Sequence, residues 1–548
     1  MAELRQPKRS AGVVRSDRHT TWRETATVLF SAPRGVRCQG GTDETVERRA
    51  EARHSGAFQP RRVAPGIVTS FDLVVVGGGI TGLGVARLAA RNGLTVAVLE
   101  RSDLASGASS CTSHMLHGGL RYLERGHFAL VREALSERAA VSRLAPAFVR
   151  PTRFLIPLRR GDRRLPWKLR LGLAAYDLFA GRAGLAPHAM VRRAEALRLE
   201  PELRSKGLAG AGLYSDTVMD DAALAVAVAR DAAAHGAQIW TYTEAIGARP
   251  VEDGVEMLAR DTLEGGERRI RGRAVVNAAG AWADGVRTTL LRALTPGAVD
   301  PAPLLRPSRG IHLVFPPLTR GHALLFFAGA DDRVLFVVPF GPRSLVGTTE
   351  VETPSPPTTD AREPSTEEVR YLRHALARIL PGPAEQPPLA VTAGLRPLLA
   401  STDPVGSASR EHRVIADGPL VTIVGGKYTT FRVMARDTLA CVVRRLGKDN
   451  LALRDPMAPL PAPVAGASIE SLAEWAVDAF ARRIEDVVRR RSALWLEPDR
   501  GRLAAPRVGA VLARRLGWSP SRLREELDSF HGALEREERF LRAAREDP

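Results

Sequence analysis

Three glycines that directly follow a short apolar segment are suited to receiving a phosphate group. Gly77, Gly79 and Gly82 form the pattern G-x-G-x-x-G after the short run 72–76, which is apolar except for Asp72. At the start of a helix, a turn without side chains lets backbone N–H groups approach a pyrophosphate. Glu100 closes the next apolar segment, where a carboxylate can accept hydrogen bonds from ribose hydroxyls. The pattern predicts a dinucleotide site, and the alternative is a tight turn beside a surface glutamate.

Two later segments indicate which dinucleotide this is. Residues 275–282 are an apolar run that ends in small residues and a tryptophan, and residues 425–430 read Gly-Gly-Lys-Tyr-Thr-Thr. Together with the first turn they provide three backbone approaches to one nucleotide, which favours the elongated FAD over NAD. Residues 276–280 alone would fit an ordinary strand and tight turn, so the interpretation depends on all three segments.

Longer motifs resemble the FAD-dependent glycerol-3-phosphate dehydrogenases. The most extensive is residues 109–124, Ser-Ser-Cys-Thr-Ser-His-Met-Leu-His-Gly-Gly-Leu-Arg-Tyr-Leu-Glu. Further matches follow in family order at residues 214–216, 220–221, 347–352, 394–398 and 425–430. The resemblance covers residues 71–438, with a weaker echo at 486–492. It implies a fold like that of the D-amino-acid oxidase flavoproteins.

The resemblance also implies a reaction. An enzyme of this family oxidises sn-glycerol 3-phosphate to dihydroxyacetone phosphate by hydride transfer to FAD and passes the electrons to a quinone. One alternative is a glycerol-3-phosphate oxidase that uses oxygen, because access to the reduced flavin selects the acceptor and no motif reports that access. Another is a flavin-binding scaffold without turnover. Peripheral attachment to the cytoplasmic membrane is implied as well, and a dimer is left open.

Matching the motifs residue by residue assigns the site. The cofactor is expected at Gly77, Gly79, Gly82, Glu100, Ser109, Ser110, Gly280, Gly426, Lys427 and Thr429. The phosphorylated substrate is expected at Arg121, Tyr122, Arg396 and Lys427. Guanidinium forks and an ammonium group suit a dianionic phosphate in a partly dry pocket. Without the resemblance, each of these cations would more often be a surface or interdomain ion-pair residue.

Oxidation at C2 of the substrate requires a group that takes the proton of the C2 hydroxyl. His312 is the candidate base, because it lies in the alternating segment 310–315 on the face opposite Ile311 and Leu313 and matches a histidine of the family. Arg396 is assigned to catalysis with it. The alternative is a strand histidine that satisfies a buried hydrogen bond, and His117 is a weaker candidate for the base.

An α/β fold must position these residues. Short apolar runs at 72–76, 95–99, 274–278 and 420–424 predict strands, and residues 82–91 predict a helix. They indicate a Rossmann-like FAD-binding domain assembled from residues 71–150, 210–290 and 395–440. Alternating residues at 310–315 and 334–339 predict an antiparallel sheet in a substrate domain of residues 151–209 and 291–394. Helical patterns at 469–491 and 507–516 predict a small C-terminal helical domain, residues 445–548.

The composition of the chain limits which macromolecules it is expected to bind. The 548 residues carry a formal charge of +18, but the arginines are scattered and aromatic residues are only 5%, which argues against a nucleic-acid partner. An anionic membrane surface is the remaining macromolecular candidate. The three cysteines are widely spaced, so we expect no metal site and a reducing, cytoplasmic location. Residues 1–70 have no sustained period and are expected to be a disordered extension.

Overall fold

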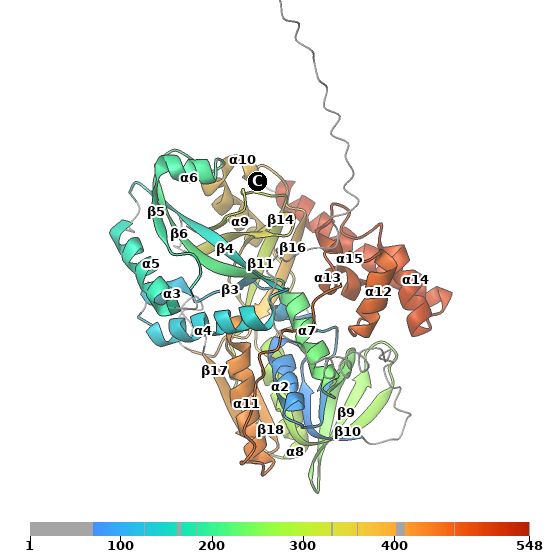
Figure 1. Ribbon diagram of the computed structural model, residues 1–548. Helices are drawn as coiled ribbons and strands as arrows, with labels where there is room; N and C mark the ends of the chain where they lie inside the picture. Colours follow the sequence, from blue (N-terminus) through green and yellow to red (C-terminus); the bar gives the residue numbers. More distant parts are fainter. Residues whose placement is uncertain are drawn as a thin grey trace, which may run out of the picture.

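The computed structural model describes residues 69–124, 126–161, 166–181, 184–329, 333–358, 360–401, 411–464 and 466–546. The extension expected at residues 1–70 lies outside this part except for its last two residues. Two mixed sheets, each covered by helices, lie one above the other, and a group of helices packs at their side (Figure 1). The predicted fold class, a Rossmann-like domain with a largely antiparallel second sheet and a helical C-terminal domain, is confirmed.

The eight-stranded lower sheet carries the glycine turn. The strands lie in the order β17-β18-β10-β1-β2-β7, parallel from β18 to β7, with β17 antiparallel at the edge. Hairpin β8–β9 extends β10 on its N-terminal half. The bounds are β1 Thr69–Val76, β2 Val96–Leu99, β7 Gln238–Trp240, β8 Thr243–Val251, β9 Gly254–Asp261, β10 Glu267–Asn277, β17 His412–Asp417 and β18 Leu420–Gly425.

Helices cover both faces of this sheet, which explains its nearly continuous apolar strands. In β1, Leu73 and Val75 pack with α2 Ile80–Arg91, α7 Asp221–Ala234 and α11 Phe431–Arg445. Val74 and Val76 point to the opposite face and pack with α8 Ala283–Leu294 and hairpin β8–β9. All four side chains are nearly inaccessible to solvent. The carboxyl ends of β1, β2, β10 and β18 are thereby fixed side by side.

The upper sheet has ten strands and carries His312. Its strand order is β15-β11-β14-β13-β12-β4-β6-β3, with β16 beside β11 and β5 beside β6. All neighbours are antiparallel except β12 and β4. The bounds are β3 Met115–Leu116, β4 Val149–Arg159, β5 Ala189–Arg192, β6 Leu208–Met219, β11 Ser308–Phe315, β12 Ala323–Phe327, β13 Val334–Phe340, β14 Arg343–Gly347, β15 Val351–Glu352 and β16 Ala390–Arg396.

Sheet membership bears on the domain boundary expected at residue 210. Strand β6 pairs with β4 along almost its whole length and belongs to the upper sheet, although residues 210–219 were expected in the FAD-binding domain. The sequence suggested the lower layer because β6 is followed directly by α7, which packs on the lower sheet. The pairing of β6 with β4 nevertheless places the strand in the upper sheet. We propose that the boundary lies at the start of α7 and that β3, within residues 71–150, also belongs with the substrate domain.

The remaining helices surround the upper sheet or form the C-terminal group. Those of the upper layer are α3 Leu120–Glu124, α4 Phe128–Leu144, α5 Pro166–Ala180, α6 Arg193–Leu199, α9 Thr366–Ile379 and α10 Pro381–Ala384. The C-terminal group has its own apolar core and contains α12 Ile469–Asp478, α13 Ile484–Arg490, α14 Ala505–Leu516 and α15 Pro520–Glu546. The helical pattern at 469–491 is divided into two helices, because Phe480 adopts a φ of 70°. Within the described residues, no helix combines the length and the hydrophobicity that a bilayer crossing requires.

Candidate cofactor and substrate site

The glycine turn after β1 is shaped by close backbone contacts. Gly77 has a φ of 114°, and a Cβ atom at this position would lie 2.5 Å from the carbonyl oxygen of Ala278. A Cβ atom on Gly82 would overlap the carbonyl oxygen of Gly77. Both positions therefore require glycine, one because of its backbone conformation and both because of space. The result is a tight turn from β1 into α2.

The turn presents the N-terminus of α2 to a cavity. Gly79, the N-cap residue, and the following Ile80 and Thr81 all line that cavity. The Ile80 N–H donates to Oγ of Ser109 at 3.0 Å, and the first turn contains no acidic residue. The first N–H groups of a helix have no intrahelical acceptor and carry a partial positive charge. This end of the cavity is therefore suited to an anion.

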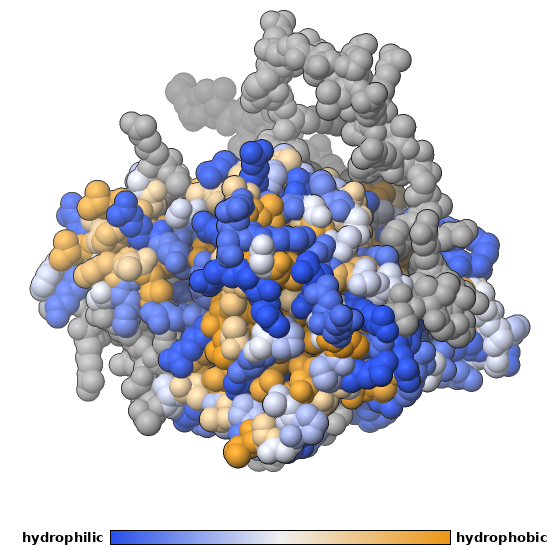
Figure 2. Space-filling view, turned by 90° about the horizontal axis from the view of Figure 1, so that it is seen from below, coloured by the Kyte–Doolittle hydropathy of each residue, from blue (hydrophilic) through white to orange (hydrophobic). Residues whose placement is uncertain are grey.

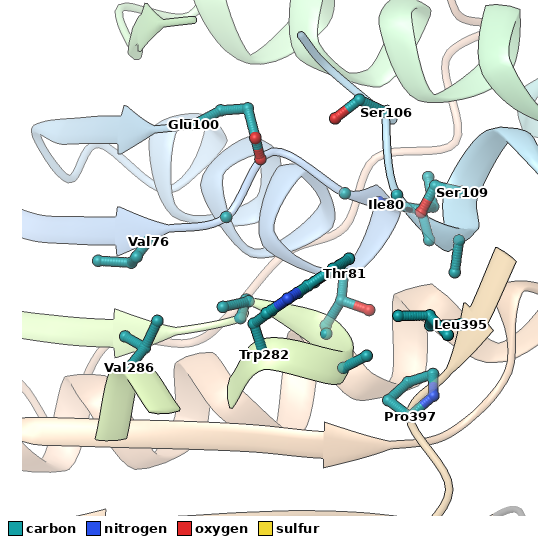
Figure 3. Close-up of a pocket in the computed structure, with 18 of the residues that line it drawn as sticks. Val76, Ile80, Thr81, Glu100, Ser106, Ser109, Trp282, Val286, Leu395 and Pro397 are labelled. Atoms are coloured by element: carbon teal, nitrogen blue, oxygen red, sulfur yellow. Dashed lines mark hydrogen bonds between the residues drawn. The ribbon is translucent and has the colours of Figure 1, made fainter. Parts of the chain in front are cut away.

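The three backbone approaches meet around this one cavity. Its lining includes Gly77 and Gly79 from the first turn, residues 278–282 after β10, and residues 425–428 after β18. Figure 3 shows side chains from these parts of the chain facing one another, with Glu100 and Ile80 opposite Trp282 and Leu395. The empty space, including its open mouth, is about 1300 Å³. The lining comes from residues that follow several parallel strands of the lower sheet, which is where dinucleotides bind in folds of this kind.

Glu100 stands at the end of β2 with both carboxylate oxygens fixed. Oε2 accepts from the Gly78 N–H at 2.7 Å, and Oε1 accepts from the Ser102 N–H at 2.8 Å. Burial raises the pKa of this carboxyl above its ordinary value, although the two N–H groups partly offset the effect. Each oxygen keeps a further acceptor position. The carboxylate is thus oriented and able to accept from hydroxyls of a ribose.

Seven of the ten expected cofactor residues line the cavity. They are Gly77, Gly79, Glu100, Ser109, Gly280, Gly426 and Lys427. Gly82, Ser110 and Thr429 are outside the lining. Gly82 packs against the backbone of Gly77, and Thr429 is 2% exposed in the short helix Tyr428–Thr430. The glycine turn, the N-terminus of α2 without an acidic residue in its first turn, and the oriented Glu100 together fit FAD, whose isoalloxazine accepts hydride when bound.

Two of the expected substrate residues contact each other. The ammonium group of Lys427 lies 4.0 Å from the ring centroid of Tyr122, within the range of a cation–π interaction. Lys427 also lines the cavity, so this contact lies at its border. Arg121 is placed in α3 next to Tyr122, and its side chain is outside the described part of the structure.

Arg396 lies at the end of β16, where its guanidinium crosses the neighbouring strand β11. It donates to Oγ1 of Thr348 at 2.6 Å, to the Thr349 carbonyl at 3.1 Å and to the Arg309 carbonyl at 3.4 Å. Its neighbours in sequence, Leu395 and Pro397, line the cavity. The guanidinium therefore supports the 348–349 segment and also brings a positive charge close to the cavity.

His312 is a buried side chain of β11, close enough to Arg396 to feel its charge. It is 3% exposed, its Nε2 shares a hydrogen bond with Oγ of Ser113 at 2.9 Å, and its Nδ1 has no partner among the described residues. Burial, and next the charge of Arg396, lowers the pKa of His312 to about 3. Ile311 and Leu313 point to the other face, as predicted. The imidazole is thus neutral, but it is not part of the cavity lining.

Comparison with known proteins identifies the family. The family model for FAD dependent oxidoreductases matches residues 72–432, which include both sheets and all three backbone approaches. The chain belongs to this family. FAD as cofactor and oxidoreductase as enzyme class, both predicted from the sequence, are confirmed.

Curated relatives and solved structures refine the assignment. Glycerol-3-phosphate dehydrogenase 2 of Mycobacterium tuberculosis is 34% identical over 535 residues, covering 85% of this chain and 88% of the relative. The mitochondrial glycerol-3-phosphate dehydrogenase of Mus musculus is 31% identical and covers 90% and 76%. The glycerol-3-phosphate dehydrogenase of Bacillus halodurans, solved with FAD, has a TM-score of 0.65 at 22% identity, with 85% and 95% covered. Within the flavoprotein family, the chain is thus a member of the glycerol-3-phosphate dehydrogenases.

Several lining residues were not predicted from the sequence. Residues 243–245 follow β7, and Arg101, Ser102, Ser106 and Gly107 belong to the loop after β2. The guanidinium of Arg101 lies 4.6 Å from the ring centroid of Trp282, and both residues line the cavity. Strand β7, of only three residues, was not recognised. Because β7 is parallel to β2, the residues that follow it lie at the same edge of the sheet as the cavity. Recognising β7 would therefore have predicted that residues 243–245 line the cavity.

Proposed function

We propose that the enzyme oxidises sn-glycerol 3-phosphate to dihydroxyacetone phosphate, with FAD as the hydride acceptor and a quinone as the final electron acceptor. The observation that carries the proposal is the 34% identity to glycerol-3-phosphate dehydrogenase 2 of Mycobacterium tuberculosis, which extends over 85% of the chain. Independent support for a phosphorylated substrate comes from the site.

The cations near the cavity supply that support. A phosphate dianion has three charged or partly charged oxygens that require strong donors in a partly dry pocket. Lys427 offers an ammonium at the border of the cavity, and Arg396 brings a guanidinium next to lining residues. An amino-acid substrate, as taken by other members of the fold, would need a clamp for a carboxylate at its reacting end instead.

We propose His312 as the group that receives the C2 hydroxyl proton. The neutral imidazole has one nitrogen, Nδ1, without a partner among the described residues, and the other nitrogen is oriented by Ser113. A substrate phosphate near Arg396 would offset part of the positive charge that lowers the pKa of His312, and so make the imidazole a stronger base when it is needed.

We also propose that the enzyme contacts an anionic membrane surface through α5 and the start of α4. Phe128, Trp167, Leu171 and Leu178 are 52%, 60%, 64% and 78% exposed. The exposed cations Lys168 and Arg170 lie among them on α5. Figure 2 shows apolar side chains beside charged ones at the left edge of the lower face, the side on which α5 lies in Figure 1. Exposed apolar side chains with cations next to them suit the interface of an anionic bilayer.

The substrate proposal is tested by anaerobic mixing of the purified holoenzyme with glycerol 3-phosphate, glycerol or glycine. Bleaching of the flavin absorbance by glycerol 3-phosphate alone is the expected result. Rapid bleaching by glycine, or none by glycerol 3-phosphate, contradicts it. Reoxidation of the reduced enzyme is then followed with a short-chain quinone and with oxygen. Faster reoxidation by oxygen, with formation of hydrogen peroxide, identifies an oxidase instead of a quinone-linked dehydrogenase.

A further inference from the structure

A buried group of charges joins the C-terminal helices to the loop after β2. Asp103, in that loop, is fully buried and accepts from the guanidinium groups of Arg490 and Arg491. Arg491 donates to it through Nη1 at 2.5 Å and Nη2 at 2.7 Å, and is itself almost inaccessible. Burial alone would raise the pKa of Asp103, but the two arginines hold that pKa below its ordinary value. The carboxylate is therefore ionised, and its hydrogen-bond donors Arg490 and Arg491 belong to the helical domain.

A second carboxylate extends this group. Asp486 of α13 accepts from Nη2 of Arg490 at 2.9 Å and from the Tyr242 hydroxyl at 2.7 Å. Its other oxygen accepts from the N–H groups of Arg482 and Arg483, both at 2.9 Å. The two arginines and two aspartates balance in charge, and all of them are at most 9% exposed. Losing one member would leave a buried charge unpaired, which is costly.

The same loop forms one wall of the cavity. Ser102, Ser106 and Gly107 line it on either side of Asp103. The Ser102 N–H donates to the Glu100 carboxylate at 2.8 Å, and the Ser102 carbonyl accepts from the Tyr242 N–H at 2.9 Å. Two residues beyond Asp103, the Ala105 N–H donates to the Gly78 carbonyl at 2.9 Å. Asp103 thus lies at the centre of a loop that fixes both Glu100 and the glycine turn.

We propose that Arg490 and Arg491 of the C-terminal helical domain act through Asp103 as positioning residues for the adenosine half of FAD, so that this domain controls how long the cofactor stays bound. The inference rests on the proposed placement of the ribose at Glu100. Covalent continuity does not enforce this arrangement, because Asp103 and Arg491 are 388 residues apart. Apolar packing would be enough to hold two domains together. Here, instead, two guanidinium groups donate directional hydrogen bonds to Asp103, in the loop whose Ser102 N–H donates to Glu100.

The test compares FAD release from the holoenzyme and two variants. Asp103→Asn keeps the shape of the side chain but removes the charge between two buried arginines. The matched control is Glu526→Gln, because Glu526 is also buried and is held by Arg483 at 3.1 Å and Arg522 at 2.6 Å, wholly within the helical domain. FAD release is followed by the rise of flavin fluorescence after dilution, and the unfolding midpoint is measured in parallel.

We expect Asp103→Asn to release FAD at least about tenfold faster, a change of roughly 1.4 kcal/mol if the binding rate is unchanged. Its KM for glycerol 3-phosphate at saturating FAD should stay the same. Glu526→Gln should lower the unfolding midpoint while keeping parental FAD release. Parental release from Asp103→Asn, or an equal acceleration in both variants, overturns the proposal and leaves the cluster as a structural fastening.

A milder variant covers the case in which Asp103→Asn does not fold. Arg491→Lys keeps the positive charge but loses the bidentate grip on Asp103, so we expect an intermediate acceleration of FAD release. Unchanged release in a folded Arg491→Lys protein that has lost stability counts against the proposal. Failure of the substrate proposal can be distinguished from failure of this one. FAD release is measured without substrate, so it can be determined even if glycerol 3-phosphate does not reduce the flavin. Failure of the cofactor placement is recognised by Gly79→Val, which then leaves FAD binding intact.

Discussion

At the residue scale, His312 has an environment that strongly favours its neutral form. The side chain lies under β14, where a Cβ atom on Gly347 would overlap its ring, and the hydroxyl of Ser113 orients Nε2. With a pKa of about 3, the imidazole stays unprotonated throughout the range in which enzymes are usually assayed. An acid limb of the reaction between pH 5 and pH 8 would therefore have to come from another group.

The first prediction is that His312→Gln reduces its flavin about a hundredfold or more slowly, the range expected for loss of a general base. Glutamine keeps a polar side chain but cannot take up a proton near neutral pH. Anaerobic stopped-flow mixing with glycerol 3-phosphate measures this step, and FAD content and substrate binding should be retained. A parental rate would leave His312 as a structural strand residue and direct the search to His117 or a bound water.

The same residue predicts a pH dependence of stability. In the unfolded chain His312 titrates near its ordinary value of 6.5, whereas burial lowers its pKa to about 3 in the folded protein. Its contribution is present above pH 6.5 and is lost as the pH falls toward about 3, because only the unfolded chain then binds the proton. The free energy of unfolding of His312→Gln should consequently decrease less between pH 7 and pH 4. Parallel curves from urea unfolding would show that the imidazole titrates normally.

Arg396 should have two separable roles. Arg396→Ala is expected to lower kcat/KM for glycerol 3-phosphate about tenfold to a hundredfold, the cost of losing a charge-assisted contact, with a much smaller effect on unphosphorylated glycerol. It should also lower the unfolding midpoint, because the Thr349 and Arg309 carbonyls lose their donor. Arg413→Ala, at an exposed position on β17, controls for the change in net charge. Equal losses with both substrates would assign Arg396 to the scaffold alone.

At the element scale, the strands and the helix that carry the glycine turn were predictable, because a parallel sheet covered on both faces produces short apolar runs. Residues 72–76, 274–278 and 420–424 coincide closely with β1, the end of β10 and β18. The three-residue strand β7 is too short to show a pattern, and the sharp break at Phe480 depends on a backbone conformation that its residue type does not favour. Local patterns do not report these features.

The turn from β1 into α2 supports a prediction about cofactor binding. Gly79→Val should abolish FAD binding, because even a Cβ atom would lie 3.2 Å from Oγ of Ser109 and the branched side chain would extend into the cavity. The backbone conformation at Gly79, φ −79° and ψ 174°, is open to valine, so the fold should persist. Flavin absorbance per mole of purified protein is the measurement. Gly266→Val, in a turn with open space around it, is the control.

At the scale of the whole molecule, the family, the cofactor and the fold class were predictable from the sequence, but the long-range ion pairs were not. The arginines at 489–491 belong to a segment with only a weak echo of the family, and nothing in their spacing points to Asp103. Such a pair depends on how two domains pack, which local periodicity does not encode. The distribution of exposed apolar residues over α4 and α5 likewise emerges only when the surface is known.

That surface predicts attachment to lipid. The double variant Trp167→Ser and Leu171→Ser should bind vesicles of mixed neutral and anionic phospholipid at least about tenfold more weakly, since two exposed apolar side chains are lost from the interface. Flavin reduction by glycerol 3-phosphate should be unchanged in solution. Leu503→Ser, which alters a side chain 82% exposed on the helical domain, is the control. Equal vesicle binding by all three proteins would remove α5 from the proposed membrane contact.

The strand order of the lower sheet also has a consequence for biosynthesis. Strand β10 lies between β1 and β18, so the middle of the sheet joins segments that leave the ribosome at widely different times. Until β18 emerges, the nascent nucleotide sheet keeps an unpaired edge, a feature that invites wrong associations. The third backbone approach is translated with residues 425–428, and the arginines that grip Asp103 follow more than sixty residues later. A complete FAD site therefore requires synthesis at least as far as residues 425–428, and the loop around Asp103 gains its arginine partners only after residues 490–491 have followed.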